Sequence, residues 1–312
     1  MELREAERIT GDSEHGVMLL VDVEQIGLVE VRAKPGDIAP PLHVHARHAE
    51  TFFVLEGELT LRLEDRELRA GTGTWVHVPP EVVHTFSVTG DSLAHFLDIH
   101  TPSCGFGDFV RGLHAASTED ELRTVRAEFD QEPAPEYASG DPGLVTVCRI
   151  GGVSGVGPTE PPESAGAGSA GTVAGYGETI GESDPEHRAT LVVDTDELAV
   201  TEFLRHPGSQ GPPPHVHHEH ADAFLVVGGE LKLTLGTGSF SGQVGTFFLA
   251  PPDVVHTFAN DGTAPAHFFN FHMPATDFGD YMRGRKPDFD QHVVPPDSGV
   301  DPATAVVTRL SG

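Results

Sequence analysis

The feature that most constrains this chain is a long internal repeat. Residues 43–61 read HVHARHAETFFVLEGELTL and residues 215–233 read HVHHEHADAFLVVGGELKL, an offset of 172 residues with 11 of 19 positions identical. The same offset aligns VPPEVVHTF at 78–86 with APPDVVHTF at 250–258. A repeat far longer than the 20–50 residues of solenoid units indicates that a whole domain has been duplicated.

The remaining sequence predicts the domain boundaries. FDQ at 129–131 matches FDQ at 289–291, so the offset falls to 160 and the first copy carries a 12-residue insertion. Residues 151–171 are rich in Gly, Pro, Ser and Ala, a composition typical of a flexible linker. We therefore expect one domain over 1–150, the linker over 151–171 and a second domain over 172–312. At 312 residues the chain is long enough for two domains with separate cores.

Short strand patterns dominate each copy. LTLRLEDRELRAG at 59–71 alternates apolar and polar residues, as a half-buried strand does, and LKLTLGTGSFSGQVG at 231–245 predicts two strands around a glycine-rich hairpin. Helical periodicity is confined to 108–129 and a shorter counterpart at 278–289, where Asp108 and Asp280 resemble helix starts with a capping role. The sequence therefore predicts an all-β sandwich or barrel for each copy.

Histidines and one carboxylate in each copy have the spacing of metal ligands. His43 and His45 stand two apart in a strand-like segment, so both imidazoles can face one point. Glu50 begins the next strand, and His84 opens another strand after a Pro-Pro turn. Three neutral nitrogens and one carboxylate oxygen suit a divalent first-row metal and leave positions open for water or substrate. The corresponding residues of the second copy are His215, His217, Asp222 and His256, in which Asp is one methylene shorter than Glu.

This arrangement resembles the two motifs of the cupin superfamily. In the first copy the motif positions are Gly36, His43, His45, Glu50 and Gly57, then Gly73, Pro79 and His84. In the second they are Gly208, His215, His217, Asp222 and Gly229, then Gly245, Pro251, His256 and Asn260. The resemblance implies two tandem cupin barrels of the double-stranded β-helix (jelly-roll) type with short helical extensions, each with a metal in its lumen. The chain departs from the motifs where Glu81 and Asp253 replace the usual Gly and where Val88 replaces Asn.

The segment HVHxxxxETFFVLEGEL is similar to that of quercetin 2,3-dioxygenase-like cupins. That resemblance implies an enzyme, a metal-dependent dioxygenase acting on an enolic or phenolic small molecule, with Glu50 as the catalytic base. Fe(II) is the metal we expect, although the same ligands accept Mn, Ni, Co, Cu or Zn, with up to two metals per chain. Two alternatives stay open: a redox-neutral isomerase, decarboxylase or lyase, and a non-catalytic bicupin that binds small molecules.

Other recurring residues allow more than one interpretation. Phe52, Phe86, Phe224 and Phe258 share a face with a ligand and can line a substrate pocket, although a packed core is the stronger interpretation. His48 and His220 are expected to be solvated residues of a turn at the barrel rim. The pairs His95/His267 and His100/His272 could orient a ligand or simply lie in the core. We expect the first copy to be the main site, because its ligand set is complete.

Composition excludes several classes of partner. With 19 basic and 48 acidic residues the net charge is −29, which disfavours nucleic acids and anionic membranes. The N-terminal residues MELREAERIT do not resemble a signal peptide, and no apolar stretch of about 18 residues occurs, so we expect a cytoplasmic protein. The expected partners are a small-molecule substrate and O2, and the expected state is a monomer or homodimer.

Overall fold

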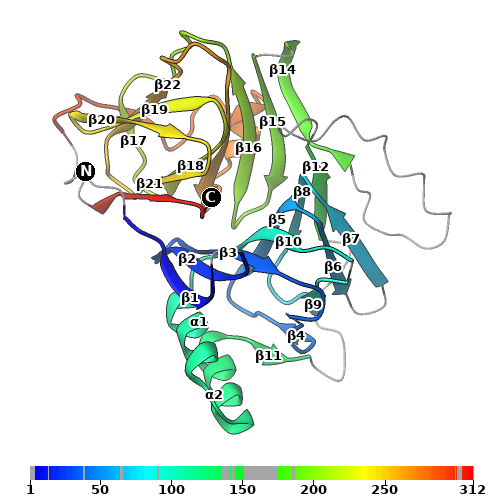
Figure 1. Ribbon diagram of the computed structural model, residues 1–312. Coiled ribbons are helices and arrows are strands. Elements are labelled where there is room, and N and C mark those ends of the chain that lie inside the picture. The colour runs from blue at the N-terminus through cyan, green and yellow to red at the C-terminus, as the bar shows by residue number, and fades with distance from the viewer. Residues whose placement is uncertain are drawn as a thin grey trace. The chain divides into compact units, whose positions relative to one another are not determined.

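The structure is a computed structural model that describes residues 4–12, 14–37, 39–63, 66–89, 91–134, 141, 145–150, 175–184, 187–298, 300 and 304–311. The chain divides into two compact units (Figure 1). One unit spans Arg8–Tyr176, and the other spans Gly177–Gly312 together with the start of the chain up to Glu7. The predicted linker 151–171 lies outside the described residues, so the predicted domain boundaries stay a prediction.

The first unit contains a larger and a smaller sheet. The larger has eight strands in the order β1 (Glu7–Gly11), β2 (Gly16–Val23), β3 (Ile26–Ala33), β10 (Ala94–Thr101), β5 (Ala49–Glu56), β8 (Thr74–Val78), β12 (Thr146–Arg149) and β13 (Gly175–Tyr176). The smaller has five in the order β11 (Glu132–Pro133), β4 (His43–Val44), β9 (His84–Ser87), β6 (Glu58–Leu63) and β7 (Arg66–Gly71).

The second unit repeats this plan. Its larger sheet has seven strands in the order β14 (Glu178–Asp184), β15 (His187–Asp194), β16 (Ala199–Arg205), β23 (Ala266–Met273), β18 (Ala221–Gly228), β21 (Thr246–Ala250) and β25 (Val306–Arg309). Its smaller sheet has five in the order β20 (Gly238–Gln243), β19 (Glu230–Leu235), β22 (His256–Ala259), β17 (His215–Val216) and β24 (His292–Val293). Each unit therefore has the two-sheet jelly-roll architecture that the sequence predicts.

Strand patterning explains where the core lies. Leu59, Leu61 and Leu63 alternate along β6 and are fully buried, because every second side chain of a strand points to the same face. They pack with Phe52 and Phe86 in the hydrophobic core of the first unit. The predicted hairpin at 231–245 is also confirmed, because β19 and β20 pair as far as Leu235↔Gly238 around a two-residue turn.

Two motif glycines mark a place where the backbone leaves no room for a side chain. Gly57 and Gly229 have φ values of +79° and +67°. A Cβ at Gly57 would lie 2.4 Å from the carbonyl oxygen of Leu93, and one at Gly229 would lie 2.3 Å from that of Pro265. Only glycine combines this left-handed conformation with so close an approach.

The helical region differs from the prediction. The stretch 108–129 forms two helices, α1 (Phe106–Ala115) and α2 (Glu119–Phe129), because a capping box between Thr118 and Glu121 starts a new helix. Its counterpart is the single short helix α3 (Phe278–Met282). The predicted capping role of Asp108 and Asp280 is wrong, since both lie in the first turn of a helix whose cap residue makes no side-chain bond.

Candidate metal centres

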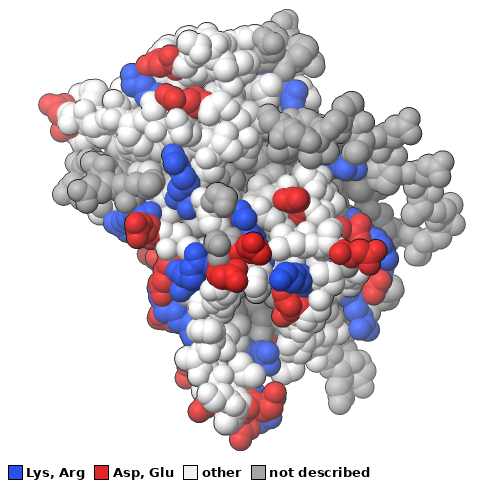
Figure 2. Space-filling view, viewed as in Figure 1, with Lys and Arg blue, Asp and Glu red and all other residues white. Residues whose placement is uncertain are grey.

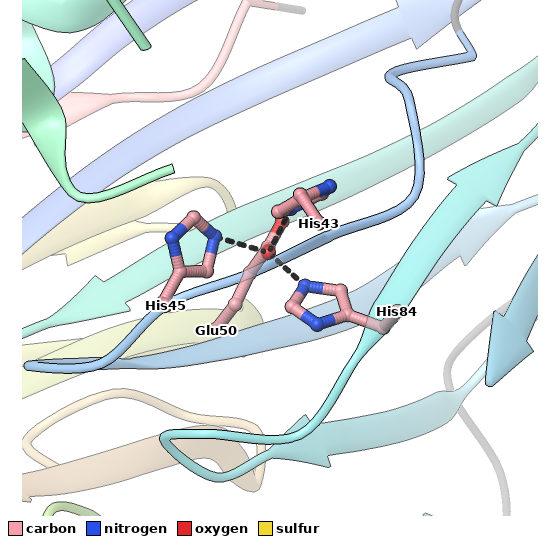
Figure 3. A group of neighbouring side chains, drawn as sticks. All are labelled: His43, His45, Glu50 and His84. Atoms are coloured by element: carbon pink, nitrogen blue, oxygen red, sulfur yellow. Dashed lines mark hydrogen bonds and ion pairs between the residues drawn. The ribbon is translucent and has the colours of Figure 1, made fainter. Parts of the chain in front are cut away.

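In the first unit, three strands bring the four predicted ligands together. His43 begins β4 and pairs with His84 at the start of β9, whereas His45 follows β4 and Glu50 lies in β5. All four side chains are buried, with exposed fractions of 1–2%. Their side chains converge on one point (Figure 3), and one nitrogen or oxygen from each lies within 4.8 Å of the others.

Glu50 Oε2 lies at the centre of this group. It is 2.5 Å from Nε2 of His84, 3.2 Å from Nε2 of His45 and 3.7 Å from Nε2 of His43. The three imidazoles therefore present the same nitrogen to one carboxylate oxygen. This is the donor set of a site for a divalent transition metal.

Backbone carbonyls select the tautomer of each imidazole. Nδ1 of His43, His45 and His84 lies 2.8 Å from the carbonyl oxygens of Pro41, Asp130 and Val82, respectively. Because a carbonyl only accepts hydrogen bonds, each Nδ1 carries a proton, so each ring has its lone pair on Nε2 when it is neutral. Outer partners of this kind orient histidine ligands in metal sites.

The donor set fits a metal by a second criterion. Nε2 of His43 is buried and has no hydrogen-bond partner among the described residues, and the same is true of Nε2 of His217 in the second unit. A buried polar atom without a partner is costly unless something absent from the protein chain binds it. A metal held by these nitrogens would remove that cost.

The second unit repeats the geometry with Asp222 as the carboxylate. Asp222 Oδ2 lies 3.1 Å from Nε2 of His256 and 3.6 Å from Nε2 of His217. Nδ1 of His215 and of His256 each lies 2.9 Å from a backbone carbonyl, those of Pro213 and Val254, and Nδ1 of His217 donates to Asp290. Asp222 therefore reaches the histidine group despite its shorter side chain.

Burial and charge shift the protonation of the ligands in different directions. Burial lowers the pKa of His43 to about 4 and that of His215 to about 3, so both are neutral at neutral pH. Burial opposes ionisation of Glu50, but the charge of His84 and the contacts with all three histidines outweigh it and hold the pKa of Glu50 well below its usual range. Burial opposes protonation of His84, but the charge of the Glu50 carboxylate outweighs it, so the pKa of His84 in the metal-free protein is raised.

Sequence reasoning missed a residue beside each carboxylate. Asp98 on β10 is buried next to Glu50 and His100, with its oxygen 3.2 Å from Nε2 of His100. Burial and the charge of Glu50 raise the pKa of Asp98 well above its usual value. The equivalent residue of the second unit is Asn270, which donates from Nδ2 to Asp222 Oδ1. The repeat carried the signal, because AHFLDIH at 94–100 aligns with AHFFNFH at 266–272.

The prediction of solvated turn residues at His48 and His220 is wrong, since their exposed fractions are 0% and 1%. Each ring packs close to the neighbouring ligand, with centroids 4.1 Å apart for His45 and His48 and 4.0 Å for His217 and His220. They are buried because a phenylalanine from the repeated FDQ segment covers each, Phe129 at 5.0 Å and Phe289 at 5.0 Å.

In the second unit these histidines extend a hydrogen-bonded chain. His272 Nε2 lies 2.9 Å from Asn270 Oδ1, and His272 Nδ1 lies 2.9 Å from His220 Nε2. His220 Nδ1 is 3.1 Å from the Thr276 hydroxyl. His100 and His272 therefore lie beside the ligand group, whereas His95 and His267 bond Glu30 and Glu202 at 2.7 and 2.8 Å, away from it.

The four predicted pocket phenylalanines differ in their surroundings. Phe258 lines a cavity of about 190 Å³ that also reaches His215 and Asp222. Phe52, Phe86 and Phe224 lie in the two hydrophobic cores. A second cavity, of about 200 Å³, lies beside His43 under α2 of the first unit.

The chain resembles known proteins in sequence and in fold. The cupin domain family matches twice, at residues 29–100 and 202–272, which run from within β3 to within β10 and from within β16 to within β23. The chain therefore contains two cupin domains, one in each unit, and is a bicupin of the cupin superfamily.

Two curated proteins share short segments with it. Quercetin 2,3-dioxygenase of Bacillus subtilis is 39% identical over 44 residues, 14% of this chain and 13% of that protein. An uncharacterized protein of Aquifex aeolicus is 38% identical over 69 residues, 22% of this chain and 56% of that protein. The matched segments thus span less than two thirds of either relative.

Solved structures share the fold over most of the chain. AerE from Microcystis aeruginosa is 12% identical with a TM-score of 0.51, covering 86% of this chain and 96% of that one. A single-residue variant of oxalate decarboxylase from Bacillus subtilis is 16% identical with a TM-score of 0.51, covering 88% of this chain and 78% of that one. These identities support a common fold and nothing finer.

The surface agrees with the acidic composition. Figure 2 shows acidic side chains gathered at the end of the first unit that holds α1 and α2, where Glu119, Asp120 and Glu121 form the first turn of α2. Elsewhere on this face, basic and acidic side chains are interspersed. In the part of the chain that the structure describes, no helix combines the length and the apolar character needed to cross a membrane.

Proposed function

We propose that this bicupin is a metal-dependent dioxygenase that acts on an enolic or phenolic small molecule, with Fe(II) as the expected metal. The observation that carries the proposal is the convergence of three Nε2 atoms on one carboxylate oxygen, with every Nδ1 held by a backbone carbonyl. The 44-residue match to quercetin 2,3-dioxygenase supports the reaction class.

His43, His45 and His84 would hold the metal together with Glu50, and the second group would hold another. A divalent metal bound there supplies Lewis acidity that favours the ionised form of an enol or phenol and the redox capacity to react with O2. Glu50 is ionised at neutral pH because the surrounding histidines lower its pKa. It is therefore ready to accept the proton that the substrate oxygen loses.

Metal content is the first test. Protein purified without a His tag is expected to contain close to two divalent metals per chain by elemental analysis. Metal-replete protein is then expected to consume O2 with a flavonol or a β-diketone, measured with an oxygen electrode. Failure to consume O2 with any member of either class would remove the support for a dioxygenase.

Glu50 and Asp222 separate the contributions of the two units. If the first unit is the main site, Glu50→Ala lowers turnover more than Asp222→Ala does. Equal losses of turnover, or a larger loss for Asp222→Ala, would contradict the assignment of the first unit as the main site.

A redox-neutral lyase or decarboxylase is the second candidate. The fold shared with oxalate decarboxylase favours it, and that enzyme from Bacillus subtilis contains Mn(II) centres. Turnover that persists under anaerobic conditions, or with Zn²⁺ in place of a redox-active metal, would select this candidate over the dioxygenase.

A further inference from the structure

The cavity of about 190 Å³ in the second unit combines three kinds of wall. One part consists of residues of the ligand group and its neighbours, His215, Asp222 and His272. Phe203 and Phe258 supply aromatic surface. The third part is the charged side chain of an arginine at the end of β16.

That arginine, Arg205, has no acidic partner among the residues that the structure describes. Its Nη1 donates to the carbonyl oxygens of Arg188 and Leu204, each at 3.0 Å, and its guanidinium carbon lies 4.3 Å from the ring centroid of Phe203. By contrast, Arg188 on the adjacent strand pairs with Glu202 at 3.4 Å. In a chain with 48 acidic and 19 basic residues, an arginine left without a carboxylate is unexpected.

Burial strengthens the case that an anion belongs there. Arg205 is half-buried, and burial lowers its pKa to about 10, so it stays cationic at neutral pH in a partly desolvated place. A desolvated cation gains more from a carboxylate than a surface cation does, and the guanidinium fork matches a carboxylate with two parallel hydrogen bonds.

The strand register sets the spacing between this charge and the ligand group. Asp222 pairs with His272 on β23, His272 pairs with Ala199 at the start of β16, and Arg205 pairs with Ala266 six residues farther along β16. Six residues of strand span about 20 Å between Cα atoms, and Phe203 lies between the two positions on the same face as Arg205. The guanidinium carbon of Arg205 lies 4.3 Å from the Phe203 ring, and one cavity is lined by both residues and by Asp222.

We propose that this cavity binds a small aromatic acid. Its carboxylate pairs with Arg205, its ring packs against Phe203 and Phe258, and a phenolic or enolic oxygen faces the His215–Asp222 group. The assignment of that oxygen rests on the proposed metal-dependent function, whereas the anion site at Arg205 does not. A cavity of about 190 Å³ lies below the roughly 300–1,000 Å³ of sites for drug-sized ligands, so a one-ring acid fits better than a three-ring flavonol.

The first unit lacks the pair of an arginine and a phenylalanine on this strand. At the repeat offset of 172, Val31 stands in the place of Phe203 and Ala33 in the place of Arg205. Glu30 and Glu202 confirm the alignment, since each bonds the equivalent histidine, His95 or His267. The two units would therefore differ in the ligand they accept, and the acid would bind to the second.

Calorimetric titration of the full-length protein tests the proposal without relying on turnover. The probes are 4-hydroxybenzoate and the longer 4-hydroxycinnamate, each compared with its uncharged amide. At least one acid is expected to bind about 10- to 100-fold more tightly than its amide, the range of a charge-assisted hydrogen-bonded pair. Because the preference resides in Arg205, it is expected in both metal-free and metal-replete protein.

Variants locate the anion. Arg205→Met, which keeps the length of the stem but removes the charge, is expected to bind acid and amide equally. Arg285→Gln is the matched control, because it removes one positive charge from the same unit at an exposed residue outside the cavity. Arg205→Lys keeps the charge and is expected to keep a reduced preference, which covers the case in which Arg205→Met fails to fold.

Equal affinities of acid and amide in the unaltered protein would overturn the proposal whatever the variants do. So would an acid preference that survives Arg205→Met, since the anion would then bind elsewhere, for example near Arg123 and Arg126 in the other cavity. Acid binding that depends on Arg205, in a protein that consumes no O2 with any substrate, would contradict only the proposed dioxygenase function.

Discussion

At the scale of single residues, the backbone carbonyls behind the imidazoles decide what the two ligand groups can bind. Each of His43, His45 and His84 has its Nδ1 proton directed to a carbonyl, so Nε2 faces the other ligands as a lone pair. These nitrogens converge on the Glu50 carboxylate, an arrangement that is favourable only if a cation lies between them, either a proton on His84 or a metal. The same reasoning applies around Asp222.

Removal of one imidazole from each group should therefore remove one metal. His84→Ala and His256→Ala are each expected to lower the metal content from about two to about one per chain, measured by elemental analysis of matched preparations. His114→Ala, at an exposed residue of α1, is the control that should keep both metals. Unchanged metal content in both ligand variants would contradict the assignment of these residues.

Asp98 allows a test of protonation at the residue scale. Because burial and the charge of Glu50 raise the pKa of Asp98 well above its usual value, we expect its carboxyl group to favour the neutral form. Asp98→Asn, which copies Asn270, is then expected to change the free energy of unfolding of the metal-free protein by less than about 1 kcal/mol, whereas Asp98→Ala should cost about 1–3 kcal/mol. Urea unfolding at pH 7 measures both, and a large loss for Asp98→Asn would show that the carboxyl is ionised.

At the scale of elements, the chain that follows each barrel returns to fix the loop between the histidine pair and the carboxylate. Asp130, at the end of α2, accepts hydrogen bonds on Oδ2 from the backbone N–H groups of Ala46 and Arg47 at 3.0 and 2.8 Å. Its own carbonyl oxygen accepts from His45 Nδ1 at 2.8 Å. Asp290 does the same for His218 and Glu219.

Asp130→Ala should loosen this loop while leaving every ligand in place. The expected result is a 10- to 100-fold weaker affinity for the metal at the first site, as for other residues that orient ligands. Competition with a chelating indicator measures it, and Asp108→Ala, at a side chain that is 93% exposed, is the control. An affinity equal to that of the control would show that the loop needs no such support.

The same elements show how far the sequence can be interpreted. The ligands were predictable because motif spacing and strand alternation place them on one face, and the repeat gives them twice. The burial of His48 could not be predicted in this way, since it depends on Phe129, which lies 81 residues farther along the chain. The departures at Glu81 and Asp253 have a local meaning, because both residues have φ of +66°, the conformation that favours glycine.

At the scale of the whole molecule, the chain combines a large negative charge with many buried histidines. Burial lowers the pKa of His43, His77 and His100 to about 4 and that of His215 and His220 to about 3. In the unfolded chain these rings titrate near 6.5. Between pH 6.5 and about 4, the unfolded state therefore binds protons that the folded state does not, so the folded state loses stability as the pH falls.

Metal-free protein should consequently become much less stable on mild acidification. Each of the five histidines contributes about 1 kcal/mol to the loss between pH 7.5 and pH 5.5, which adds up to several kcal/mol. Charge repulsion acts in the opposite direction, because added protons reduce a net charge of −29, and salt screens that repulsion.

Urea midpoints at the two pH values, in EDTA and at constant high ionic strength, isolate the histidine contribution. Metal bound to the same nitrogens competes with protons, so metal-replete protein should keep its stability to lower pH. A midpoint that is the same at both pH values would show that these histidines are not held neutral by the fold.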